Sequence, residues 1–192
     1  NLGTIVDSEV DSTFRIYLTR PISRGSVFIS KMLVVYIYTT FMMFFFFFYS
    51  LFISYLLLGS GELIVFHKGI LLLSEDDIIW RFFLSFIFSN LVMITVSSLC
   101  LAFSSFSKNS VTPIISTISI VFIGTAISFI PIDIFEMVDP YLFTGYIDIF
   151  LLAFHDPIPY KTFLNCFIVT SFWSLIFIVF AYYNFSKRDI LE

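Results

Sequence analysis

"MLVVYIYTTFMMFFFFFYSLFISYLLL", residues Met32 to Leu58, contains no charged residue. A helix needs about 20 predominantly apolar residues to cross the hydrocarbon core of a bilayer, so this stretch is long enough to span it with some tilt. The apolar residues do not alternate with polar ones, as they would in the strands of a membrane barrel. The stretch therefore predicts a transmembrane helix.

The composition of the whole chain supports the same interpretation. Of its 192 residues 59% are hydrophobic and only 12% are charged, whereas about a quarter are charged in soluble domains. Three more apolar runs follow, at residues 78–106, 111–130 and 162–185. We predict an integral membrane protein of the all-α class, a bundle of four spans. Arg81 alone carries a charge inside a span, and we expect it to reach the nearby interface.

The distribution of Lys and Arg predicts the orientation, because basic residues are retained on the cytoplasmic side. If the segment before Met32 is cytoplasmic, that side holds Arg15, Arg20, Arg24, Lys31, Lys108, Lys187 and Arg188, and the other side holds Lys68, Arg81 and Lys161. We therefore place residues 1–31, 107–110 and 187–192 in the cytoplasm, and residues 59–77 and 131–161 outside. The outer segments are acidic, which favours a hydrated rim over a cation site because no ligand-loop spacing is present.

Motifs for catalysis or nucleotide binding are missing from the sequence. "GSGELIVFHKG" has glycines but not the spacing or the terminal Lys-Ser/Thr of a phosphate-binding loop. His67 and His155 are too few and too isolated for a metal site, and Cys100 and Cys166 lie inside apolar runs. We predict no enzymatic activity, no cofactor and no metal in this chain. The net charge of −4 argues against a nucleic-acid partner.

The segment before the first span has two possible roles. Pro21 disfavours helical geometry in the residue before it, which predicts a short helix from Thr13 to Thr19. Phe14, Tyr17 and Leu18 share one face of that helix. The face either lies in the lipid as an interfacial anchor or docks into a groove of a cytoplasmic partner. A second helix start at Ser23 or Ser26 leads into the first span.

Residues 8–31, "SEVDSTFRIYLTRPISRGSVFISK", resemble the cytoplasmic coupling loop of ABC-2 type permeases, the transmembrane subunits of ATP-binding cassette (ABC) transporters. The pattern of that loop is an acidic residue, Gly-Thr, an apolar stretch, (Thr/Ser)-Arg-Pro-(Ile/Val)-Ser-Arg, and a Lys that opens the next span. The matching residues are Glu9, Thr13, Arg20, Pro21, Ser23, Arg24 and Lys31, while Ser12 stands where the family usually has glycine. The ending "FSKRDILE", residues 185–192, is also similar to the family's.

The resemblance implies six spans per subunit, with the coupling loop between the second and third. This chain would then hold the last four spans, and we expect the first two to be absent or to lie before Asn1. Residues 1–31 form the coupling loop in this scheme, and residues 32–192 form the transmembrane domain. A re-entrant hairpin is implied before the last span, which suits Tyr141 to Phe154, with Gly145 at its bend.

The resemblance also implies a function, that of the permease subunit of an exporter in a prokaryotic cell membrane. The partners would be a second permease subunit, identical or different, membrane lipid, and cytoplasmic ABC ATPase subunits that hold ATP and Mg. The Phe-rich spans suggest a lipophilic or amphiphilic cargo. Coupling to the ATPase would involve Glu9, Thr13, Phe14, Arg15, Tyr17, Leu18, Arg20, Pro21, Ser23, Arg24 and Lys31. The alternative is a membrane anchor or scaffold that recruits a cytoplasmic partner without transporting anything.

Overall fold

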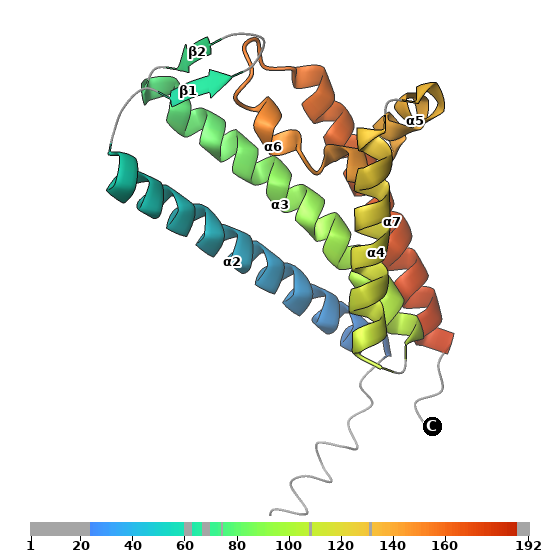
Figure 1. Cartoon of the computed structure of the whole chain (residues 1–192). Coiled ribbons are helices and arrows are strands. Elements are labelled where there is room, and N and C mark those ends of the chain that lie inside the picture. Colours follow the sequence, from blue (N-terminus) through green and yellow to red (C-terminus); the bar gives the residue numbers. More distant parts are fainter. Residues whose placement is uncertain are drawn as a thin grey trace, which may run out of the picture.

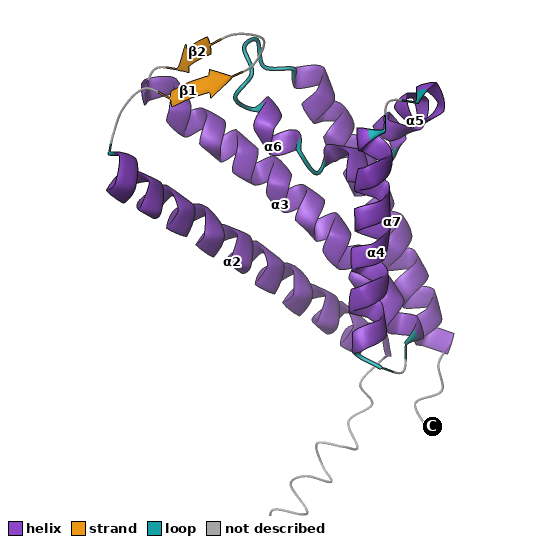
Figure 2. Cartoon of the chain, in the orientation of Figure 1, coloured by secondary structure: helices purple, strands orange, loops and turns teal. Residues whose placement is uncertain are grey.

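The computed structural model describes residues 24–59, 63–66, 70–73, 75–107, 109–130 and 132–187. Four long helices dominate it: α2 (Arg24–Leu58), α3 (Glu75–Phe106), α4 (Val111–Phe129) and α7 (Tyr160–Lys187). Between α4 and α7 lie four short helices, α5 (Asp133–Val138), η1 (Asp139–Tyr141), η2 (Phe143–Tyr146) and α6 (Ile149–Leu152). Figure 2 shows how far helix predominates. The predicted all-α class is confirmed.

Each long helix contains a segment that is long and apolar enough to cross a membrane: Gly25–Leu57, Ile78–Phe106, Val111–Phe129 and Tyr160–Lys187. The predicted four-span layout is therefore confirmed. α2 begins well before the uncharged run at Met32, since Ser26, Ser30 and Lys31 continue the same helix; the Ser30 hydroxyl donates a hydrogen bond to the Ser26 carbonyl at 2.9 Å.

The ends of the helices follow local chemistry. α2 stops where Gly59 adopts a left-handed conformation at φ 76°, with its amide donating to the Tyr55 carbonyl. Pro113 lies in the first turn of α4, where its missing amide hydrogen leaves no helical bond unmade. These signals end and start helices at the connections, not inside the spans.

A small antiparallel hairpin joins α2 to α3. It consists of β1 (Leu63–Phe66) and β2 (Ile70–Leu73), with Leu63 opposite Leu73 and Phe66 opposite Ile70. The sequence analysis identified this stretch only as an outer segment between two spans. Two four-residue strands add little to the fold, which remains a helical bundle.

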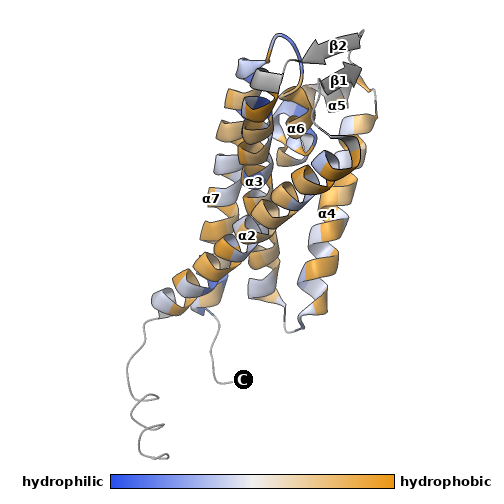
Figure 3. Ribbon diagram, turned by 90° about the vertical axis from the view of Figure 1, so that its left-hand side faces the viewer, coloured by the Kyte–Doolittle hydropathy of each residue, from blue (hydrophilic) through white to orange (hydrophobic). Residues whose placement is uncertain are grey.

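The helices are arranged so that the bundle has two distinct ends (Figure 1). The start of α2, the connection between α3 and α4, and the end of α7 lie together, and we call this the entry end. The hairpin β1–β2 and the short helices α5 and α6 lie at the opposite end, called here the far end. α2 slants across α3, which runs alongside α7 (Figure 3).

Candidate functional site

The predicted coupling residues fall mostly outside the described residues. Glu9, Thr13, Phe14, Arg15, Tyr17, Leu18, Arg20, Pro21 and Ser23 belong to that group, so their predicted roles stay predictions. Arg24 is the first residue of α2, and Lys31 lies two turns further along the same helix. The structure therefore places the point where the predicted coupling segment enters the bundle, at the entry end.

The start of α2 is held against the end of α7 by aromatic packing. Phe28 is buried, with 4% of its surface exposed. Its ring lies edge-on to Tyr182 at 5.5 Å between centroids and tilted against Phe185 at 5.7 Å. Ala102 and Ala181 complete the buried cluster, and their small side chains leave room for the ring. A movement of α2 at this end would therefore change the contact of Phe28 with α7.

Two hydroxyl pairs connect α2 with α3 further along. Tyr36 Oη lies 2.6 Å from Ser98 Oγ, and Thr39 Oγ1 lies 2.8 Å from Ser97 Oγ. Tyr36 and Thr39 are three residues apart and therefore lie on the same face of α2. Toward the far end this contact continues with Phe47 on Phe86, at 4.8 Å between ring centroids.

Part of the interface between α3 and α7 consists of three hydroxyl side chains, Thr95, Thr170 and Ser174, which we call the hydroxyl seam. Thr95 and Thr170 are completely buried. Thr95 Oγ1 lies 3.2 Å from the Thr170 carbonyl and accepts a hydrogen bond from Ser174 Oγ at 3.0 Å. Small residues allow close approach of helix backbones in a membrane, where their hydroxyls can bond across the interface.

Arg81 behaves differently from the sequence prediction. We expected its side chain to reach the membrane interface, but only 8% of its surface is exposed. Its Nη1 donates to the carbonyl of His155 at 2.7 Å and to that of Ala153 at 3.2 Å. These carbonyls follow the last turn of α6, where helical partners are lacking, so a buried cation satisfies them. Arg81 thus fastens the short helices to α3.

The short helices also fit closely onto α4. A Cβ added to Gly124 would lie 2.6 Å from two side-chain atoms of Thr144, so only glycine permits this approach. Gly145 has the same role within the short helices, because an added Cβ would lie 2.6 Å from Asp139 Oδ1. Asp139 in turn accepts a hydrogen bond from Ser128 of α4. The sequence singled out Gly145 as a bend, but close packing is the reason for glycine there.

A cavity of about 480 Å³ lies among the short helices and the start of α7. Asp139, Asp148 and His155 are among its lining residues. In the described part of the chain, no three His, Cys, Asp or Glu side chains are grouped so that they could hold a metal ion. The cation-binding alternative for the acidic segment gains no support from this geometry.

The hydroxyl seam is the part of the arrangement that sequence reasoning missed. Its signal on α3 was a row of small residues three and four apart, Ser98, Ala102 and Ser105, following Thr95. Such spacing puts them on one helix face, and small residues on one face of a span are typical of helix–helix contacts in membranes.

Comparison with known families gives one result. The sequence pattern of a family described as "ABC-2 family transporter protein" matches residues 4–124, which include the predicted coupling segment, α2, α3 and most of α4. No curated protein and no solved structure matches the chain. The match covers well over half of the 192 residues. With its four apolar helices, the chain belongs to the ABC-2 family of transporter proteins and is a multi-pass membrane permease.

Proposed function

We propose that this chain is the permease subunit of an exporter that moves a lipophilic or amphiphilic substrate across the cell membrane. The energy comes from ATP hydrolysed, with Mg, by separate cytoplasmic ATPase subunits, and a second permease subunit completes the path. Membership of the ABC-2 family supports transport and an ATPase partner. The direction, the cargo and the coupling residues are our proposals.

The observation that carries the proposal is the continuity of α2 at the entry end. α2 begins at Arg24, within residues 8–31 that resemble a coupling loop, and runs without a break to Leu58. A hydrogen-bonded helix is stiff along its axis, so a displacement of the coupling segment is passed on to the whole of α2. Phe28 is then the pivot, because it is the buried contact between this helix and α7.

The character of the cargo is inferred from the surface of α2. Phe41, Phe45 and Phe52 each expose more than half of their surface. A second permease subunit beside this face would give a path with aromatic, uncharged walls. Such walls favour an apolar or amphiphilic molecule and offer no counter-charge for a small ion.

The test separates docking from transmission. The chain is co-purified with its ATPase, and efflux of amphiphilic dyes is measured in cells. The double variant Phe14→Ala, Tyr17→Ala should lose the ATPase, because a buried aromatic contributes on the order of 1.5 to 3 kcal/mol. Phe28→Ala should keep the ATPase bound but lose most efflux. Phe122→Ala, which changes an exposed ring of α4, is the matched control.

Three results would contradict the proposal. Full ATPase recovery and full efflux in the double variant would refute the docking helix and favour an interfacial anchor. Normal efflux in Phe28→Ala would show that the pivot does not transmit the movement. Binding of an ATPase without any ATP-dependent efflux, across the dye panel, would favour the scaffold.

A further inference from the structure

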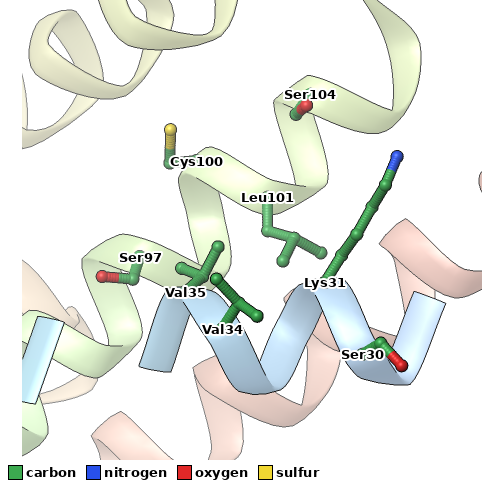
Figure 4. Close-up of a pocket in the computed structure, with 8 residues that line it drawn as sticks. All are labelled: Ser30, Lys31, Val34, Val35, Ser97, Cys100, Leu101 and Ser104. Atoms are coloured by element: carbon green, nitrogen blue, oxygen red, sulfur yellow. The ribbon is translucent and has the colours of Figure 1, made fainter. Parts of the chain in front are cut away.

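A groove of about 560 Å³ lies between the first turns of α2 and the last turns of α3 (Figure 4). Val34 and Val35 of α2 and Leu101 of α3 give it apolar walls. Its volume falls within the range of about 300 to 1,000 Å³ that is typical of small-molecule pockets.

A single cation lines this groove. Lys31 extends beside Leu101, toward the turn of α3 that carries Ser104 (Figure 4). Lys31 is exposed, and its Nζ lies over the ring of Phe185, 5.5 Å from the ring centroid. Within the described ranges no carboxylate lies at ion-pair distance from Lys31, so none of these residues neutralises its charge.

Ser104 supplies a hydroxyl beside the same groove. Ser30 also lines the groove, but its hydroxyl donates to the Ser26 carbonyl and is therefore occupied. Lys31 lies in the second turn of the membrane-spanning segment of α2, near the boundary of the bilayer. At that depth the headgroup of a lipid can meet the amine while an acyl chain runs inward along the apolar walls.

We propose that this groove binds an anionic phospholipid, with the headgroup phosphate on Lys31 and Ser104 and an acyl chain along Val34, Val35 and Leu101. A free phosphate would leave the apolar walls unused, and in a zwitterionic lipid the cation of the headgroup competes with Lys31 for the phosphate. The inference depends on the membrane-spanning fold and not on the proposed export, so the two can fail separately.

The experiment presents the purified full chain with equal amounts of phosphatidylglycerol and phosphatidylcholine that have the same acyl chains. Native mass spectrometry counts the retained lipids. The wild type should retain phosphatidylglycerol preferentially. Lys31→Gln should reduce that preference about fivefold, which corresponds to about 1 kcal/mol for one basic residue near a charged headgroup. Lys31→Arg should keep it.

Three further measurements decide between the alternatives. Lys187→Gln changes a cation at the same end that bonds to Tyr183 and does not line the groove, so it should leave the preference intact. Val35→Phe fills the groove and should lower retention of both lipids. Inorganic phosphate should not displace phosphatidylglycerol, since it offers no acyl chain.

The proposal is overturned if the wild type retains both lipids equally, or if Lys187→Gln lowers the preference as much as Lys31→Gln. Displacement of phosphatidylglycerol by inorganic phosphate would show that the groove is a phosphate site and would refute the lipid proposal. If Lys31→Gln loses its helical circular dichroism, the other two variants decide. The lipid site is supported if Lys31→Arg keeps the preference for phosphatidylglycerol and Val35→Phe retains less of both lipids.

Discussion

α2 and the pair formed by α3 and α7 are similarly apolar in sequence but differ in how they are packed. Between residues 25 and 57 of α2, Phe28 alone is buried. At the interface of α3 and α7, by contrast, Thr95, Cys166 and Thr170 are all completely buried. The two regions show that hydrophobicity does not determine which helices pack closely in this chain.

The physical reason is that lipid is as apolar as the side chains. Large apolar residues gain little by leaving the lipid for another helix, so close packing comes from small residues and interhelical hydrogen bonds. The hydroxyl seam has both, whereas the surface of α2 is mostly large aromatic and branched side chains. We therefore regard α3 and α7 as the fixed part of the subunit and α2 as the part that can move.

The largest effect is expected from Thr95→Leu, which forces a larger side chain into the hydroxyl seam and removes its hydroxyl. Overpacking costs about 1 to 3 kcal/mol, and the Ser174 hydroxyl loses its acceptor as well. We expect a loss at the upper end of this range in unfolding titrations with SDS. Thr112→Leu makes the same change at an exposed position of α4 and should be nearly neutral. Equal losses would mean that the seam is not tightly packed.

Arg81→Leu should cost about 1.5 to 3 kcal/mol, the typical value of hydrogen bonds to a charged group. The loss arises because the carbonyls of Ala153 and His155 lose their donor. Lys161→Leu removes an exposed cation from the start of α7 and serves as the control. Proteolysis of the segment between α4 and α7 should become faster in Arg81→Leu and stay unchanged in Lys161→Leu. Unchanged proteolysis would show that Arg81 does not fasten the short helices.

The same substitution, glycine to alanine, compares a closely packed position of α4 with a loosely packed position of α2: Gly124→Ala and Gly25→Ala. At Gly124 the new Cβ would lie 2.6 Å from Thr144, and we expect a loss of about 1 to 2 kcal/mol. At Gly25, in α2, the nearest atom would be 3.6 Å away, which is an ordinary contact. Thr144→Ala should partly rescue Gly124→Ala in the double variant. If Thr144→Ala does not rescue Gly124→Ala, the loss of stability does not arise from the contact between these two residues.

The smallest effect is expected from Tyr36→Phe, which removes the hydrogen bond to Ser98. Interhelical hydrogen bonds in membranes average about 0.6 kcal/mol, so the thermal midpoint should fall only slightly. Tyr38→Phe changes an exposed tyrosine of the same helix and should have no effect. A loss above about 1.7 kcal/mol, the upper end for such bonds, would mean that α2 is held as firmly as α7.

The spans could be predicted from the sequence because the length of an apolar run is set by the thickness of the bilayer. The position of the short helices could not. Their place depends on Gly124, Thr144 and Arg81, which are far apart in the sequence and meet only in the fold. Arg81 was judged by its distance from a helix end, whereas its partners belong to a segment more than 70 residues away.

The predicted coupling segment, by contrast, was identified from the sequence, and the structure adds little to it. Its residues before Arg24 were identified from a motif, and they lie outside the described residues, so the fold adds only the point of entry into α2. The packing of Phe28 on Tyr182 and Phe185 was not predictable, because nothing in the spacing of aromatic residues shows which of 28 phenylalanines are buried.

The proposed movement of α2 against α3 and α7 is tested most directly by a distance measurement in the complex with the ATPase. Spin labels are attached to cysteines at Leu56 and Ile79, and in a second sample at Ile79 and Leu164, all exposed positions toward the far end. Cys100 and Cys166 are first replaced by serine or alanine. Upon addition of a non-hydrolysable ATP analogue, the distance from Leu56 to Ile79 should change while that from Ile79 to Leu164 stays constant. A fixed distance between Leu56 and Ile79 in a transport-competent complex would contradict the account.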